Sequence, residues 1–218
     1  VLCVPRYAKW LDGALYAASL LPVLVRLRRP FPFDLIDAHF AYPDGVAAAL
    51  LGAVFRVPVV ITLRGSIVRL RHYPLHRPQV RWALRRAARV LAVSRSLKQV
   101  AVGLGVPAEH IRVIPNGVDA DRFVPCERLQ ARRALGLPPD RTIIVSVGGL
   151  NEGKGHHRVV ALLPELARRR PDLLYVIVGG ERPGDSSRPL IESLIKRHAL
   201  DDRVRLVGAQ PHDEVPLW

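Results

Sequence analysis

The sequence has no methionine and only two cysteines, and just four of its 33 basic residues are lysines. Cys3 and Cys126 stand alone, with no CxxC pair and no histidine at ligand spacing, which excludes a disulfide framework and a cysteine zinc site. A chain so poor in cysteine fits a reducing, cytosolic setting. Low-complexity segments and repeats at solenoid or propeller spacing are also lacking. With 218 residues, 49% of them hydrophobic, the chain can bury the core of one globular domain or two.

Long hydrophobic runs are lacking as well. The most apolar early segment, residues 14–25, contains Pro22 and is shorter than the roughly 20 residues that a membrane span needs, so we expect a buried helix there. The chain starts at Val1, and residues 215–218 stop inside an apolar run without a capping signal. We therefore expect an internal piece of a longer protein, cut at both ends.

Acidic residues are scarce: there are 19 against 33 basic residues, which gives a net charge of +14 and a pI near 11.0. Arginines gather at residues 26–29 and again between residues 69 and 89. One interpretation is a solvated surface that follows from nucleotide composition, and this is the favoured one. The other is contact with an anionic membrane surface or a phosphate-bearing acceptor. A basic nucleic-acid-binding module has less support, because no RNP-like aromatic stretch or zinc finger is present, so we expect no nucleic-acid partner.

Short β-branched runs alternate with helical patterns from Asp34 onward, which is typical of βα units and a mostly parallel sheet. In the first block we expect strands at 34–39, 58–63, 90–94 and 111–114, with helices at 45–55, 79–88 and 94–103. After a polar, proline-containing stretch, a second block has expected strands at 142–147, 173–178 and 204–207 and helices at 155–169 and 190–200.

This order predicts an α/β fold with two doubly wound domains. We place the first domain at residues 1–122, a linker at 123–140 and the second domain at 141–218. In open parallel sheets, ligands bind beyond the carboxyl ends of the strands, so functional residues are expected there.

The clearest candidate site is the glycine-rich turn that follows the first strand of the second domain. Gly148, Gly149, Gly153 and Gly155 leave backbone amides unobstructed around Lys154, just before a helix. Free N–H groups, the positive helix end and an ammonium together suit a phosphate. The alternative is an exposed lysine in an ordinary strand-to-helix turn.

The same turn satisfies GxxxxGK, a near-match to the phosphate loop of NTPases. The position after the lysine is Gly155, where a Ser or Thr should supply a magnesium ligand, so the NTPase interpretation ranks second.

Polar groups also gather at strand ends in the first domain. His39 ends one expected strand, and it can take a proton from an acceptor hydroxyl, hydrogen-bond to it, or simply be structural. Arg64 and Ser66 end the next strand, where Arg64 can hold a phosphate or carboxylate or be one more surface arginine. Asp119 and Asp121 spell DxD, but their position after a Pro-Asn-Gly turn favours a structural turn over a metal site.

Adjacent histidines at 156 and 157 point to different faces of a helix, which also argues against a metal pair.

Seven blocks in order resemble the family 4, or group 1, glycosyltransferases: DLIDAHFAYPDG, VVITLRGS, VLAVSRSL, VIPNGVDADRF, VGGLNEGKG, LYVIVGGE and DDRVRLVGAQP. The resemblance runs from about Asp34 to the last residue. It implies a GT-B architecture with two Rossmann-like domains, both incomplete here. The first holds the acceptor and the second holds a nucleoside-diphosphate sugar. It also implies sugar transfer with retention and without a metal or other cofactor.

Individual roles carried over by the resemblance concern both domains. Lys154 matches the lysine that contacts the donor diphosphate, beside Gly148, Gly149 and Gly155. Glu181 and Gly208 match the nucleotide pocket. His39 matches the second histidine of a cleft pattern whose first histidine is replaced by Asp37. The turn before the hinge is matched by Asn116, Gly117 and Asp119.

Two departures from the family pattern limit these expectations. The family often places an arginine at the position of Gly149. Its paired glutamates are expected after residue 218, and its first glycine-rich loop before residue 1, so we expect little or no transferase activity from this chain alone. Relatives with a block like HFAYPDG suggest a glycan or lipid-linked glycan acceptor in polysaccharide assembly. The location would be the cytoplasm, peripheral to the inner membrane surface.

Overall fold

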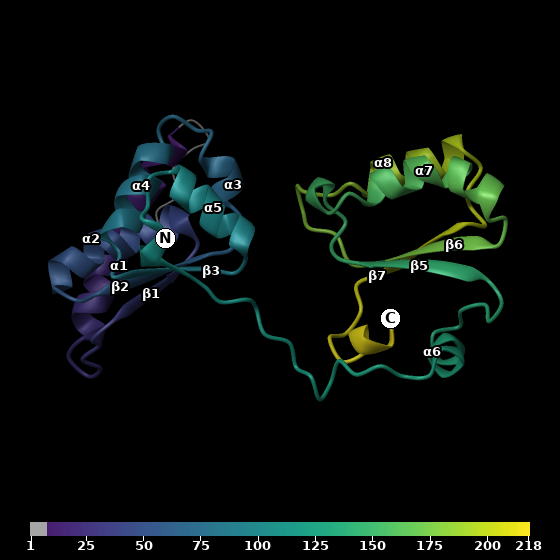
Figure 1. The fold of residues 1–218 in the computed structure, drawn as a ribbon, viewed down its shortest axis with the longest axis horizontal. Helices are drawn as coiled ribbons and strands as arrows, with labels where there is room; N and C mark the ends of the chain where they lie inside the picture. Colours follow the sequence, from purple (N-terminus) through teal and green to yellow (C-terminus); the bar gives the residue numbers. More distant parts are fainter. Residues whose placement is uncertain (1–7) are drawn as a thin grey trace. The chain divides into compact units, whose positions relative to one another are not determined.

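The computed structural model describes residues 8–218. The chain divides into two compact units, unit 1 up to Gly117 and unit 2 from Val118 to Trp218 (Figure 1). Each unit has its own parallel sheet and its own hydrophobic core. Both are of the α/β class that the sequence predicts, and we describe each by itself.

Unit 1 is built on a four-stranded parallel sheet in the order β1-β2-β3-β4. The strands are β1 (Ile36–His39), β2 (Val59–Leu63), β3 (Arg89–Ala92) and β4 (Ile111–Val113). The helices are α1 (Asp12–Leu27), α2 (Val46–Phe55), α3 (Ile67–Leu70), α4 (Arg77–Arg86) and α5 (Arg95–Gly103). Shorter helical turns lie at Lys9–Leu11, Ala41–Gly45 and Ala108–His110.

The core of unit 1 lies between the sheet and the layer that contains α2, α4 and α5. β2 contributes Ile61 and Leu63, which are fully buried against apolar residues of these helices such as Leu84. Strands in the middle of a parallel sheet read as nearly continuous apolar runs, which is why VVITL was recognisable in the sequence. Because the four strands are all parallel, their carboxyl ends share one edge of the sheet.

A helix forms at residues 14–25 as expected, but the prediction that it is buried is wrong. Only Gly13 and Ala17 of α1 are buried, and the helix lies along α2 with one face while Val23 and Val25 stay exposed on the other. The helix also continues through Pro22. By length and composition alone, the helical stretch Lys9–Leu27 could cross a membrane, a test that core helices and signal sequences also pass.

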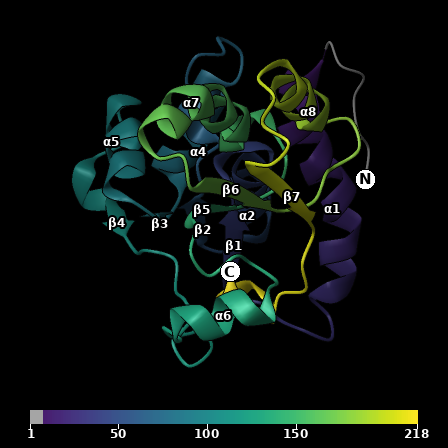
Figure 2. The same ribbon diagram turned by 90° about the vertical axis from the view of Figure 1, so that its right-hand side faces the viewer.

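Unit 2 is built on a three-stranded parallel sheet in the order β5-β6-β7. The strands are β5 (Thr142–Val147), β6 (Leu173–Val178) and β7 (Val204–Gly208), and the helices are α6 (Arg128–Ala134), α7 (His156–Arg169) and α8 (Arg188–Arg197). Short helical turns lie at Glu152–Lys154 and Val215–Leu217. All six residues of β6 are buried, because helices α7 and α8 cover one face of the sheet, and Leu135 and Leu137, which follow α6, pack with Trp218 against the other (Figure 2).

The segment expected as a linker, residues 123–140, contains helix α6. Glu127 caps this helix by accepting hydrogen bonds from the backbone N–H groups of Leu129 and Gln130. Leu137 then packs against Leu174 and Val176 in a cluster on the second sheet. Leu137 is the buried residue of this segment, and with the partly buried Leu135 it joins the core of unit 2, whereas residues 123–130 are exposed.

Candidate functional site

The carboxyl ends of the three strands in unit 2 are joined by backbone hydrogen bonds. Gly148 N–H donates to Val178 O (2.8 Å), and Gly179 N–H donates to Gly208 O (2.8 Å). Leu150 N–H donates to Gly180 O (2.9 Å). The loops after β5, β6 and β7 therefore form one continuous rim at this edge of the sheet.

Glycine is required at two places in this rim. A Cβ atom on Gly179 would lie 1.9 Å from the carbonyl oxygen of Gly148, far inside van der Waals contact. Gly208 adopts φ 85°, in the left-handed region that favours glycine. The close approach of the β5 and β6 loops thus depends on the GG pair that follows β6.

His156 supports the rim from below, at the start of α7. It is 3% exposed, and its Nε2 lies 3.2 Å from Gly148 O while its Nδ1 lies 3.3 Å from Tyr175 Oη. A carbonyl can only accept, so Nε2–H donates to Gly148. Tyr175 is also hydrogen-bonded to Ser146 (3.0 Å), and burial raises the pKa of its phenol. The sequence showed only that His156 does not form a metal pair with its neighbour and gave no sign of this network.

Lys154 lies in the short turn between β5 and α7, with its side chain against Gly148. A Cβ built on Gly148 would lie 3.4–3.6 Å from the side-chain carbons of Lys154, so the stem of the lysine passes over this glycine. The residue is exposed, and in the described part of the chain its ammonium has no carboxylate within ion-pair distance. The result is an unneutralised cation held beside the carboxyl end of β5.

Backbone donors surround this cation. Within residues 8–218, the N–H groups of Gly149, Gly153 and His156 have no hydrogen-bond acceptor. Gly155, at φ 73°, is the left-handed residue that ends the turn after Lys154 and lets α7 begin at His156. Unpaired N–H groups at a helix start and a nearby ammonium form a place where an anion is stabilised.

Glu181 follows the glycine pair after β6, and its carboxylate is already bound by two nearby residues of the chain. Its carboxylate accepts from Ser186 Oγ (2.7 Å) and pairs with Arg188 (3.0 Å), and these contacts hold the pKa of Glu181 below its usual value. Arg188 also pairs with Glu192 (2.6 Å). A ligand that uses Glu181 must compete with Ser186 and Arg188 for its carboxylate.

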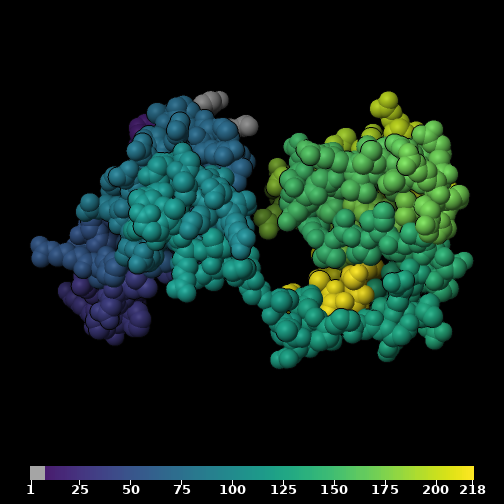
Figure 3. Space-filling model, in the orientation of Figure 1, coloured from purple at the N-terminus to yellow at the C-terminus, as the bar shows by residue number. Residues whose placement is uncertain are grey.

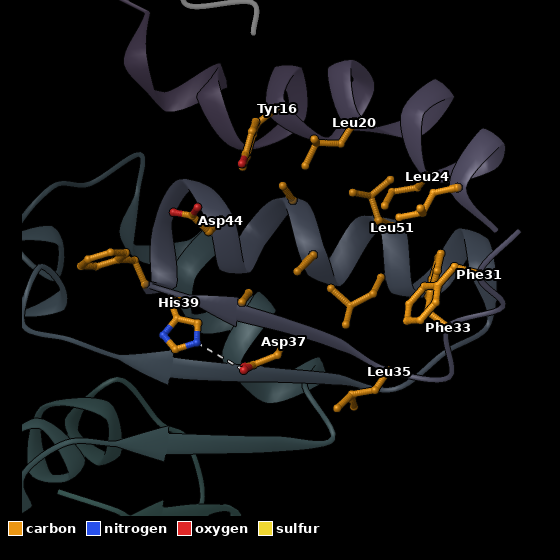
Figure 4. A pocket seen from close by; sticks show the side chains of 16 residues that line it. Tyr16, Leu20, Leu24, Phe31, Phe33, Leu35, Asp37, His39, Asp44 and Leu51 are labelled. Carbon is orange, nitrogen blue, oxygen red and sulfur yellow. Dashed lines mark ion pairs between the residues drawn. The ribbon is translucent and has the colours of Figure 1, made fainter. Parts of the chain in front are cut away.

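In unit 1, the predicted acceptor-side residues lie at strand ends and form a chain of contacts. Arg64 Nε–H donates to His39 Nδ1 (2.9 Å), and Arg64 Nη1–H donates to Asn116 Oδ1 (3.3 Å). On its other side, His39 Nε2 lies 3.3 Å from Asp37 Oδ2 (Figure 4). The lone pair of His39 that would take a proton therefore accepts a hydrogen bond from Arg64.

Near the same strand ends lie a hydroxyl group without a hydrogen-bond partner among the described residues and an apolar cavity. Ser66 Oγ is buried without a hydrogen-bond partner in the described chain, directly after Gly65 at φ 112°. Asp37 and His39 also line one end of a cavity of about 460 Å³ between α1, α2 and β1, whose walls are apolar side chains such as Leu20, Leu24 and Leu51 (Figure 4).

The residues predicted as a hinge turn have defined local partners. Asn116 holds Arg64, as described above. Asp119 Oδ1 accepts from the backbone N–H groups of Asp121 and Arg122 (both 3.2 Å), which confirms the predicted turn for the DxD sequence. Gly117 is the last residue of unit 1. Within residues 8–218, no group of three or more His, Cys, Asp or Glu side chains is placed to hold a metal ion.

Comparison with known families agrees with this arrangement. Residues 3–122 match glycosyltransferase family 4, and residues 127–217 match the glycosyl transferases of group 1. The chain belongs to glycosyltransferase family 4. The resemblance noted in the sequence is thereby confirmed, and so is the GT-B fold, since parallel sheets of this kind recur in solved GT-B structures.

Among curated relatives of this family 4 chain is the 2-deoxystreptamine glucosyltransferase of Streptomyces kanamyceticus, 32% identical over 92% of this chain and 55% of the relative. The amylovoran biosynthesis glycosyltransferase AmsK of Erwinia amylovora is 29% identical over 94% of this chain and 49% of its own length. Among solved structures, Anabaena HepE in complex with UDP superposes with a TM-score of 0.75 at 24% identity, covering 91% of this chain and 53% of HepE. The family 4 chain spans about half the length of these relatives.

Proposed function

We propose that the full-length protein is a retaining glycosyltransferase that moves a sugar from a nucleoside-diphosphate sugar to a glycan or lipid-linked glycan, without a metal. Family membership supports the reaction class. The relatives' names support sugar transfer, since one is a 2-deoxystreptamine glucosyltransferase, and a glycan product, since another serves amylovoran biosynthesis. HepE, a structure of the same fold, was solved with UDP.

The observation that carries the proposal is the position of Lys154. Its stem lies against Gly148 and its ammonium is unpaired in the described chain, beside the free N–H groups of the turn that opens α7. In a transfer of this kind, negative charge builds on the departing nucleoside diphosphate. Donors that are already fixed around that charge lower the barrier without reorganising during the reaction.

Because position 149 is a glycine and not an arginine, Lys154 must supply a larger part of the positive charge that stabilises the leaving diphosphate. Where an arginine is absent, the leaving diphosphate depends on Lys154, on the amides of the turn and on the positive end of α7. The rim behind the turn is held by His156 and Gly179, so these donors keep their positions.

Unit 1 supplies the acceptor side of the proposal. Arg64 is exposed and its partners, His39 and Asn116, are neutral hydrogen-bond acceptors, so its positive charge remains available to a phosphate or carboxylate of the acceptor. Ser66 Oγ, unpaired within residues 8–218, lies two residues further along the chain.

The test is Lys154→Ala in the full-length protein, with Lys196→Ala as the matched control. Lys196 is also exposed in unit 2 but lies at the end of α8 that leads into the opposite edge of the sheet. We expect Lys154→Ala to raise the barrier by about 3 kcal/mol, mainly through kcat, with a smaller change in the KM for the donor. Lys196→Ala should leave both unchanged.

Steady-state rates are measured with UDP- and GDP-sugars in the presence of EDTA. An unchanged kcat for Lys154→Ala would remove this residue from the mechanism. Magnesium-dependent triphosphate hydrolysis with no sugar transfer would instead establish an NTPase.

A further inference from the structure

The positive charge of the protein is concentrated in unit 1. This unit contains 17 basic and 5 acidic residues, whereas unit 2 contains 16 basic and 14 acidic residues, so 12 of the 14 net positive charges lie in unit 1. No acidic residue occurs between Asp44 and Glu109. A bias that came only from nucleotide composition should affect both units alike, and the basic residues are indeed evenly divided. The asymmetry lies in the missing acids of unit 1.

Helices α3 and α4 and the turn between them carry a dense part of this charge. We define the α3–α4 surface by six exposed arginines of this segment: Arg69, Arg71, Arg77, Arg81, Arg85 and Arg86. In the space-filling view, the blue and teal segments that include α3, α4 and α5 form a continuous part of the surface of unit 1 (Figure 3).

The charges on this surface are not neutralised within the described chain. None of the six arginines has a carboxylate within ion-pair distance, whereas in unit 2 Arg169, Arg170 and Arg188 all pair with acids. Arg77, Arg81 and Arg85 are spaced four residues apart on one side of α4, where like charges destabilise a helix. This row of charges therefore costs α4 some stability that no acidic neighbour offsets.

Apolar side chains stand among these arginines. Tyr73 is 45% exposed, Leu75 is 55% exposed and Trp82 is 40% exposed. Val80, Ala83 and Leu84 of α4 face the core, which places Trp82 on the outer face, where its neighbours one turn further on are Arg85 and Arg86. Tryptophan and tyrosine favour the boundary between lipid headgroups and acyl chains, and arginines beside them attract anionic headgroups.

We propose that the α3–α4 surface binds the surface of a bilayer that contains anionic phospholipids, with Trp82 as its apolar contact. The combination of cations without counterions and exposed aromatic and aliphatic side chains fits a lipid interface. A duplex nucleic acid would use the arginines but would give no role to Leu75 and Trp82. The inference concerns binding alone and does not depend on transferase activity or on Lys154.

The test is sedimentation of the protein with vesicles of phosphatidylcholine, with and without phosphatidylglycerol. We expect binding only when phosphatidylglycerol is present, weakening as salt is raised. The triple variant Arg77→Gln, Arg81→Gln, Arg85→Gln should lose about fivefold in partition coefficient per charge, or about a hundredfold in all. The matched control, Arg133→Gln, Arg168→Gln, Arg197→Gln, removes three exposed arginines of unit 2 that are unpaired within the described residues and should lose much less.

A second variant keeps the test independent of folding of the triple variant. Trp82→Phe should weaken binding several-fold and abolish the blue shift of tryptophan emission that vesicles cause in the wild-type protein. Equal losses in the α3–α4 triple and the control triple, or an unaltered blue shift in Trp82→Phe, would overturn the proposal. So would tighter binding of duplex DNA that displaces the protein from vesicles and is lost in the same triple variant.

Discussion

The hydrogen bond from Arg64 to His39 decides what this histidine can do. Nδ1 accepts from Arg64 and Nε2 faces Asp37, so both ring nitrogens are engaged. A histidine in this state positions the guanidinium rather than taking a proton from a hydroxyl. The two roles suggested for His39 by the sequence, proton acceptor and hydrogen-bonding residue, can therefore be separated by a substitution that keeps only the acceptor.

His39→Asn is that substitution, because the asparagine oxygen can replace Nδ1 as the acceptor for Arg64. We expect His39→Asn to retain most of the transferase rate of the full-length enzyme and the pH dependence of the wild type, and His39→Ala to lose much more. Loss of a general base would instead lower the rate about 10²- to 10⁴-fold in both variants. Rates over a range of pH distinguish these results, and equal, large losses would contradict a positioning role.

At the level of elements, the contact between the loops after β5 and β6 ties the fold to the candidate donor site. Gly148 presents its carbonyl to His156 and its Cα to the stem of Lys154, while Gly179 approaches from behind. A side chain at position 179 must push this loop away, and it must therefore disturb Lys154 as well as the sheet.

Gly179→Ala tests this coupling. The added Cβ would lie 1.9 Å from Gly148 O, and we expect the free energy of unfolding of unit 2 to fall by about 3 kcal/mol. Gly153→Ala is the control, because its Cβ would meet only Asn151 Oδ1 at 3.4 Å. Urea unfolding followed by circular dichroism measures both. A Gly179→Ala protein as stable as Gly153→Ala would show that the close approach of the two loops is not needed.

Sequence pattern predicted the strands better than it predicted the side-chain partners. The bounds of β5 and β6 agree with the expected 142–147 and 173–178, because buried parallel strands are continuous apolar runs with β-branched residues. Helix α6 was missed because RLQARRA is short and polar, and its stability comes from the Glu127 cap and from packing of the segment onto the sheet. Glu127 before that run was the available signal.

For the candidate site, the sequence predicted the local turn but not the contacts between distant residues. Lys154 and its glycines are local in sequence, so their turn was recognisable from composition. The pairing of Arg64 with His39 joins positions 25 residues apart, and the bond from Arg64 to Asn116 joins positions 52 residues apart. The hydrogen-bond acceptor that an exposed arginine contacts depends on the register of the strands that carry both residues. No spacing rule in the sequence contains that information.

On the scale of the whole chain, two hydrophobic cores are joined by a segment with little protection. Residues 114–130 are all exposed, and residues 118–127 contain no helix or strand. The arginines of α4 and α7, by contrast, lie in helices packed on a sheet. A protease needs a locally extended backbone, so the free energy of opening should be lowest between the two units.

Brief trypsin digestion should therefore cut first at Arg122 or Arg128 and leave two fragments that resist further cleavage, because each keeps its own core. Mass spectrometry identifies the cut, and circular dichroism of the separated fragments shows whether each stays folded. The double variant Arg122→Gln, Arg128→Gln should slow the first cut without changing the thermal unfolding of either unit, since neither arginine contributes an ion pair within the described chain. If the first cut falls at Arg85 instead, α4 opens more readily than the connecting segment. In that case the repulsion within its row of unneutralised arginines destabilises α4 by more than the packing of Val80 and Leu84 stabilises it.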